Sequence, residues 1–198
     1  NSVSKISITL TWKTNNYVGS NCCSWNHFSD INAIPRPSKK EGLIVNFIEN
    51  FGKRLDLDTS TDAIGNVLIK KPATPGFENC KTVVLQSHLD MVHQKNNDTV
   101  FNFETDGILM EIQQGWITAK GTTLGADNGI GVAAIMSVLS STNIEHPAIE
   151  ALFTVDEETG MTGAMELQPN FLSGDILLNL DTEDDDEISI GCAGGVDI

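Results

Sequence analysis

The stretch VVLQSHLDMV (residues 83–92) changes character half-way along its length. It opens with a continuous apolar run, which is typical of a strand buried on both faces of a sheet. The run then reaches His88 and Asp90, two polar groups whose burial costs free energy unless they find partners. The stretch therefore predicts a core strand at residues 82–86 that leads into a polar site.

A helix is expected before this strand, at residues 39–54. Ser38 and Glu41 have the spacing of a capping box, with serine at the N-cap and glutamate three residues later. Apolar residues follow at helical spacing: Leu43, Ile44, Phe47, Ile48, Phe51 and Leu55.

The rest of the chain alternates between strand and helix patterns. Strands are expected at 66–70, 82–86, 116–119, 151–155 and 176–180, with another beginning at 187–190, and helices at 127–141 and 163–167. Apolar strands that alternate with helices predict an α/β fold with a mostly parallel sheet and flanking helices.

Composition limits the classes of partner. The chain has 198 residues, 40% hydrophobic and 20% charged, with a net charge of -15 and a pI near 4.4. So acidic a protein is a poor match for nucleic acid or an anionic membrane surface. The acidic run at 183–187 is typical of a solvated loop. No apolar stretch approaches the roughly 20 residues of a membrane-spanning helix.

The cysteines and the chain ends give further expectations. Cys22, Cys23, Cys80 and Cys192 have neither zinc-finger spacing nor a secreted disulfide pattern, so we expect reduced thiols in a cytoplasmic protein. Residues 1–24 are polar and Asn-rich, and we expect a poorly ordered segment there. Residues 25–198 are expected to form the N-terminal part of a longer catalytic domain, since the chain begins at Asn1 and stops where a new segment begins.

Polar residues follow the ends of several predicted strands. Ligands in open α/β sheets bind beyond the carboxyl ends of the strands, so these side chains are expected at one edge. They are His88 and Asp90 after 82–86, Asp156, Glu157 and Glu158 after 151–155, Asp181 after 176–180, and Asp127 at the start of a helix.

This set of side chains predicts a metal site. Crowded carboxylates repel one another unless a cation lies among them. One imidazole with several carboxylates suits zinc, and manganese or cobalt less well. His88 and Asp90 point the same way from an extended backbone, so Asp90 can accept the second ring N–H of His88 and orient it.

Each residue also has an ordinary structural interpretation. His88 alone could be a buried structural histidine, and Asp127 could only cap a helix. Glu157 and Glu158 could form a solvated turn, and Asp181 could belong to the acidic loop after it. These interpretations leave unexplained why every candidate falls at the same sheet edge.

Four motifs in order resemble the co-catalytic zinc dipeptidases. They are Ser87–Asp90, Gly121–Gly131, Glu157–Met161 and Asn179–Glu183, and the likeness extends from about Trp25 to Ile198. The resemblance implies that His88 and Asp181 bind one zinc, that Asp127 bridges to a second, and that Glu158 binds the second. It further implies that Asp90 orients His88, that Glu157 is the general base, and that the Asp127–Asn128 peptide bond is cis.

The resemblance also implies an activity: hydrolysis of dipeptides, Xaa-His among a broad range, by water activated between two zinc ions. A related aminoacylase or deacylase, or an inactive fragment that keeps the fold, is the alternative. The family has a further histidine ligand for the second zinc, and His27, His93 and His146 do not match its motif. The second site is therefore expected to be incomplete in this chain. The lid and dimerisation domain of the family is likewise expected to lie outside these residues, and the full-length form is expected to be a homodimer.

Overall fold

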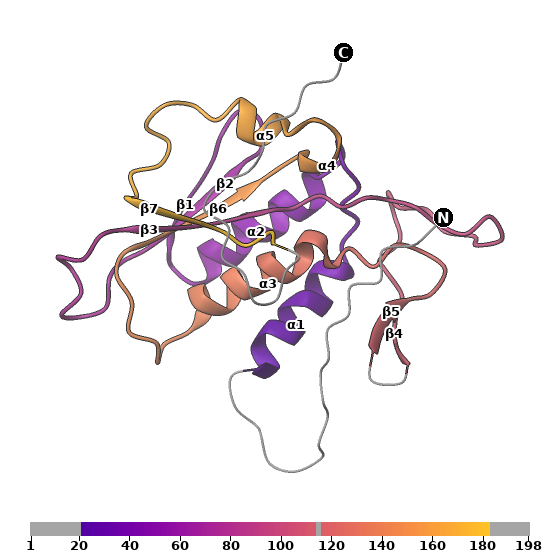
Figure 1. Ribbon diagram of the computed structural model, residues 1–198, viewed down its shortest axis with the longest axis horizontal. Coiled ribbons are helices and arrows are strands. Elements are labelled where there is room, and N and C mark those ends of the chain that lie inside the picture. Colours follow the sequence, from indigo (N-terminus) through magenta and orange to yellow (C-terminus); the bar gives the residue numbers. More distant parts are fainter. Residues whose placement is uncertain (1–20, 114–115, 183–198) are drawn as a thin grey trace, which may run out of the picture.

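The computed structural model describes residues 21–113 and 116–182. Its centre is a five-stranded sheet in the order β1-β2-β6-β3-β7, shown in Figure 1. The strands are β1 (Asp58–Thr61), β2 (Val67–Lys71), β6 (Ile149–Thr154), β3 (Val83–His88) and β7 (Ile176–Asn179). The predicted α/β class is confirmed. The sheet is mixed, because β6, β3 and β7 run parallel while β1 and β2 pair antiparallel with their neighbours.

Three helices pack on this sheet and on each other. α2 (Gly42–Arg54) packs against β1 and β2, α3 (Ala126–Ser140) against β3, and α1 (Asn21–Asn32) against α3. Figure 1 shows α1 and α3 side by side. The buried core joins the helices to the central strands, and it includes Phe28, Ile31, Ile44, Ile48, Val132, Ile135, Ala151 and Phe153. Burial of this apolar surface supplies the main driving force for the fold.

Shorter elements complete the described chain. β4 (Met110–Gln113) and β5 (Trp116–Ala119) form a separate antiparallel pair, so the strand expected at 116–119 is present but lies outside the main sheet. α4 (Glu157–Gly160) and α5 (Thr162–Met165) follow β6. None of the described helices has the length and apolar character needed to cross a membrane.

The predicted capping box is wrong. α2 begins at Gly42, and Lys39 adopts a left-handed backbone conformation with φ of 69°. The hydroxyl of Ser38 donates to Oδ2 of Asp90 at 2.8 Å instead of capping the helix. A buried carboxylate offers this hydroxyl a charge-assisted hydrogen bond, which is stronger than one between neutral groups.

The strand expected at 176–180 is present as β7. Its apolar run also predicts burial in the core, and this prediction is wrong. Ile176, Leu177 and Leu178 are 41–54% exposed. β7 is an edge strand in the described part of the chain, where it pairs only with β3. The strand expected at 187–190 lies outside the described residues.

Candidate metal centre

The pairing of the parallel strands brings the predicted site residues to one edge. Gln86 pairs with Asn179, so continuing this register by two residues places Asp181 level with His88. On the other side of β3, His88 pairs with Thr154, which places Asp90 level with Asp156. Because parallel strands share a direction, the residues just past their ends meet at the same place.

His88 lies at the centre of this cluster. Its side chain is 1% exposed, and its Nε2 lies 3.0 Å from Oδ1 of Asp127, 3.7 Å from Oδ2 of Asp181 and 3.9 Å from Oε2 of Glu157. The carboxylates are more open: the side chains of Asp127, Glu157 and Asp181 are 45%, 35% and 26% exposed. A buried imidazole thus faces a partly open ring of carboxylates that a small ligand can reach.

Two groups of ligand atoms share His88. One consists of His88, Asp127 and Asp181, and the other of His88, Glu157 and Glu158; within each group the atoms lie within 4.8 Å of one another. An imidazole nitrogen with carboxylate oxygens is a donor set suited to zinc. The first group corresponds to the residues expected around the first zinc. The second contains Glu157, the expected base, beside Glu158, the expected ligand of the second zinc.

The charges at this cluster fit a cation. Burial opposes protonation of His88, but hydrogen bonds to Asp127 and Asp90 and the nearby Asp181 raise its pKa to about 10. Burial, together with Asp127 and Glu157, raises the pKa of Asp181 to about 6 against the opposing effect of His88. Burial and the charge of Asp127 also raise the pKa of Glu158. A divalent cation would offset the repulsion among these carboxylates.

Asp90 connects the histidine to the glutamates. Its Oδ1 lies 3.2 Å from Nδ1 of His88, and it also accepts the backbone N–H of Glu157 at 3.0 Å. Its Oδ2 accepts the N–H of Glu158 at 3.2 Å and the hydroxyl of Ser38 at 2.8 Å. Burial alone would raise the pKa of Asp90, but the bonds with His88, Glu157 and Ser38 lower it to about 2. The carboxylate is thus held ionised where it can orient both the imidazole and the start of α4.

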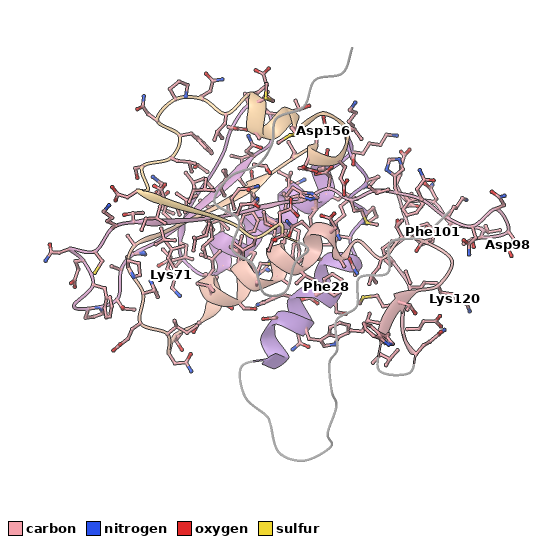
Figure 2. All side chains as sticks on the ribbon, in the orientation of Figure 1. Phe28, Lys71, Asp98, Phe101, Lys120 and Asp156 are labelled. Carbon is pink, nitrogen blue, oxygen red and sulfur yellow. The ribbon has the colours of Figure 1, made fainter. Side chains whose placement is uncertain are left out.

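Asp156 shapes the turn that carries the two glutamates. Its φ of 52° is left-handed, and its carboxylate accepts hydrogen bonds from the hydroxyls of Thr159 and Thr162. Figure 2 shows Asp156 beside α4, at the opposite end of the sheet from Lys71. The buried Asn66 braces the same turn: its Oδ1 accepts the N–H of Val155, and its amide donates to the carbonyl of Gly163. Asn66 is not among the predicted site residues, because the sequence carries no local signal for its role.

Asp127 enters the site from the first turn of α3. The Asp127–Asn128 peptide bond is cis, as the resemblance implied. The hydroxyl of Ser87, at the end of β3, lies 2.8 Å from Oδ1 of Asn128 and donates to it. This bond fastens the start of α3 to the strand that carries His88.

A further cluster of carboxylates contacts the candidate metal centre through Asp90. Glu41, Asp90 and Asp156 are all buried, with ligand atoms within 4.8 Å of one another. Burial and the charge of Asp90 raise the pKa of Glu41. One oxygen of Glu41 accepts the backbone N–H groups of Lys39 and Asp156 at 2.8 and 3.1 Å. Because its members already accept hydrogen bonds from the protein, this cluster braces the loops around the site.

The fold and the sequence together define the class of protein. Residues 84–188 match the model of peptidase family M20/M25/M40, and the chain belongs to this family of metallopeptidases. The chain is similar to two dipeptidases in particular. It is 51% identical to the cytosol non-specific dipeptidase of Escherichia coli (strain K12) over 173 residues, which are 87% of this chain and 36% of that protein.

Solved structures agree with this assignment. The aminoacylhistidine dipeptidase of Vibrio alginolyticus superposes with a TM-score of 0.80 at 53% identity, over 82% of this chain and 33% of that one. The aminopeptidase PepT of Bacillus cereus superposes with a TM-score of 0.69 at 26% identity, over 81% of this chain and 43% of that one. The chain thus spans about a third of the length of the two dipeptidases.

Proposed function

We propose that the protein is a metal-dependent dipeptidase that hydrolyses Xaa-His and other unblocked dipeptides with the aid of two zinc ions. The observation that carries the proposal is the convergence of Asp127, Asp181, Glu157 and Glu158, from separate segments, on the buried imidazole of His88. The similarity to two dipeptidases over most of this chain supports the substrate class.

His88 and Asp181 would bind the first zinc, and Glu158 would bind the second. Asp127 would bind both ions. Manganese or cobalt could replace zinc, because the same nitrogen and oxygen donors accept them. The metal ions would polarise the scissile carbonyl and lower the pKa of water near them. The three described histidines outside the site have other surroundings. Nε2 of His27 lies 3.3 Å from the hydroxyl of Ser140, and Nδ1 of His146 lies 2.7 Å from the carbonyl of Pro147. The ring of His93 packs edge-on against that of Phe103, with 5.8 Å between the ring centroids. The second zinc would therefore need a ligand from elsewhere.

Glu157 would act as the general base. Its side chain is partly exposed beside His88, and Asp90 fixes its backbone. It would take a proton from the attacking water and pass it to the leaving amine, which requires a carboxylate that is free of the metal. Asp90 would keep the His88 ring in the orientation that binds metal.

The cellular location, the class of partner and the oligomeric state are proposed as well. The Escherichia coli relative is named for the cytosol, and we propose the cytoplasm for this protein as well. A net charge of -15 favours small peptides over nucleic acid or membrane surfaces as partners. The full-length form is proposed to be a homodimer, which light scattering of that form tests.

The function is tested by assaying this chain and the full-length form, both loaded with zinc, with carnosine and with an N-acetylated amino acid. Hydrolysis of carnosine that a chelator abolishes supports the dipeptidase. Hydrolysis of the acetylated substrate alone indicates an aminoacylase. Zinc binding without hydrolysis of either substrate indicates that these residues keep the fold and a metal site without the activity.

A further inference from the structure

Arg36 is a fully buried cation next to the candidate metal centre. Its side chain is 1% exposed, in the loop between α1 and α2. Nη1 donates to the backbone carbonyls of Leu89 and Asp90 at 3.0 and 3.1 Å. Nη2 donates to Oδ1 of Asn32 at 3.2 Å and to the carbonyl of Gly125.

These contacts join the two segments that carry His88 and Asp127. The carbonyl of Asp90 lies 3.1 Å from Nδ1 of His88, and it also accepts a hydrogen bond from Arg36. The carbonyl of Gly125 belongs to the residue two positions before Asp127. One planar guanidinium therefore holds the end of β3 and the start of α3 at a fixed separation, which a flexible ammonium group cannot do equally well.

Two glycines make room for this guanidinium. A Cβ atom built on Gly125 would lie 2.4 Å from Nη2 of Arg36, and one built on Gly129 would lie 2.8 Å from it. Both distances are too short for real contacts, so a side chain at either position would displace the guanidinium. The space that the guanidinium needs thus explains why glycine occupies both positions that flank Ala126-Asp127-Asn128.

The burial of Arg36 is unfavourable for the stability of the fold. Nε is buried and has no hydrogen-bond partner among the described residues, and a buried charge carries a large desolvation cost. Three of the four hydrogen bonds of the guanidinium instead fall on backbone carbonyls, those of Leu89, Asp90 and Gly125, in the segments that carry the metal ligands. The fourth falls on the side chain of Asn32.

We propose that Arg36 is a positioning residue of the metal centre: its guanidinium holds His88 and Asp127 at the separation that a shared divalent cation requires. This inference rests on the proposed metal site at His88, Asp127 and Asp181. It concerns the geometry and affinity of the site and does not require that the chain be active.

The test is a Co²⁺ titration of the 198-residue chain, followed by calorimetry and by visible absorption, which reports the coordination geometry. Arg36→Lys keeps the positive charge and removes the fork of donors. We expect Co²⁺ to bind about 10–100-fold more weakly, as it does when other residues that support metal ligands are changed, and the absorption spectrum to change in shape. Thermal unfolding, measured in parallel, separates loss of the fold from loss of geometry.

Gly129→Ala tests the same inference without changing Arg36, because the new methyl group would lie 2.8 Å from Nη2 and push it away. The methyl group would also lie 2.9 Å from Cε2 of Phe28, so thermal unfolding of this variant is measured as well. Gly42→Ala is its matched control, since a Cβ at Gly42 meets nothing within 4 Å. Weaker binding in Gly129→Ala but not in Gly42→Ala supports the inference, and this pair decides it if Arg36→Lys does not fold. If the unaltered chain binds Co²⁺ but both Arg36→Lys and Gly129→Ala match it in affinity and spectrum, Arg36 has no positioning role. If the unaltered chain fails to bind Co²⁺, the proposed metal site is wrong and the inference is wrong with it.

Discussion

Nε2 of His88 and Oδ1 of Asp127 lie 3.0 Å apart although the two residues are 39 positions apart in the sequence. In a chain without metal, the two atoms can share a proton. With a cation present, both atoms would be ligands, so the metal replaces the proton between them.

This relationship predicts that Asp127→Asn lowers metal affinity sharply. The amide keeps the shape of the side chain but removes the anionic ligand, so we expect Zn²⁺ affinity to fall about a hundredfold or more, beyond the range typical of supporting residues. Calorimetric titration measures this change. Asp106→Asn is the control, because Asp106 is an exposed carboxylate outside both ligand groups. Equal affinities for the two variants would argue against Asp127 as a ligand.

The adjacent glutamates are expected to separate in function. In the full-length form, Glu157→Gln should remove proton transfer and lower dipeptide turnover about 10²–10⁴-fold, yet leave the metal content nearly unchanged. Glu158→Gln should lower the metal content. Elemental analysis and a dipeptidase assay of the same zinc-loaded samples measure both quantities. The reverse pattern would mean that Glu157 is the ligand and Glu158 the base.

Ser38→Ala is expected to affect the metal site and leave α2 intact. The hydroxyl of Ser38 donates to the buried carboxylate of Asp90, and its loss should lower the free energy of unfolding by about 1–3 kcal/mol. Zn²⁺ affinity should fall as well, since Asp90 orients His88. Denaturant unfolding and calorimetry measure the two effects, with the exposed Ser29→Ala as control. A loss of helical circular dichroism at unchanged affinity would restore the capping interpretation.

Glu150 is expected to make stability depend on acid pH. Its buried carboxylate accepts hydrogen bonds from the backbone N–H groups of Ser173 and Gly174 at 2.8 and 3.1 Å, and it contacts Nζ of Lys70 at 3.1 Å. Burial raises its pKa, but the bonds from Ser173, Lys70 and Gly174 lower it below the ordinary value of 4.5. These bonds fasten the segment that enters β7 and so leads to Asp181.

A carboxyl group whose pKa is lower in the folded state stabilises the fold above its unfolded pKa and loses this effect as the pH falls through the folded pKa. Glu150→Gln should therefore lower the free energy of unfolding at neutral pH, by about 1–3 kcal/mol. The difference from the unaltered chain should shrink as the pH falls below 4.5. Thermal unfolding across this range measures it, with the exposed Glu145→Gln as control. A difference that stays constant with pH would exclude the ionised carboxylate as its source.

The strands and the polar residues at their ends could be predicted from the sequence because each leaves a local pattern. The apolar run before His88 and the one before Asp156 are of this kind, and a general rule about parallel sheets then placed their ends together. The edge position that β7 has among the described residues left no such pattern. Ile176, Leu177 and Leu178 look like a core strand in the sequence, and only the strand order shows that they are exposed.

The supporting residues show the same limit. Ser38 and Glu41 fit a local capping box, yet both face partners that are far away in the sequence, Asp90 and Asp156. Local rules compare only neighbouring groups, whereas a buried carboxylate 52 positions away competes for the same hydroxyl. Burial decides the outcome, because an unpaired buried charge costs more than an uncapped helix end.

Local sequence patterns were enough to show which residue types are available for chemistry and that they follow strands of an α/β sheet. How these residues meet depends on the packing of the folded chain. The register of β3 with β7 sets Asp181 level with His88, and the buried Arg36 joins the segments of His88 and Asp127. The physical reason is that apolar periodicity is a property of neighbouring residues, while the contacts of a buried polar group depend on which distant segments pack around it.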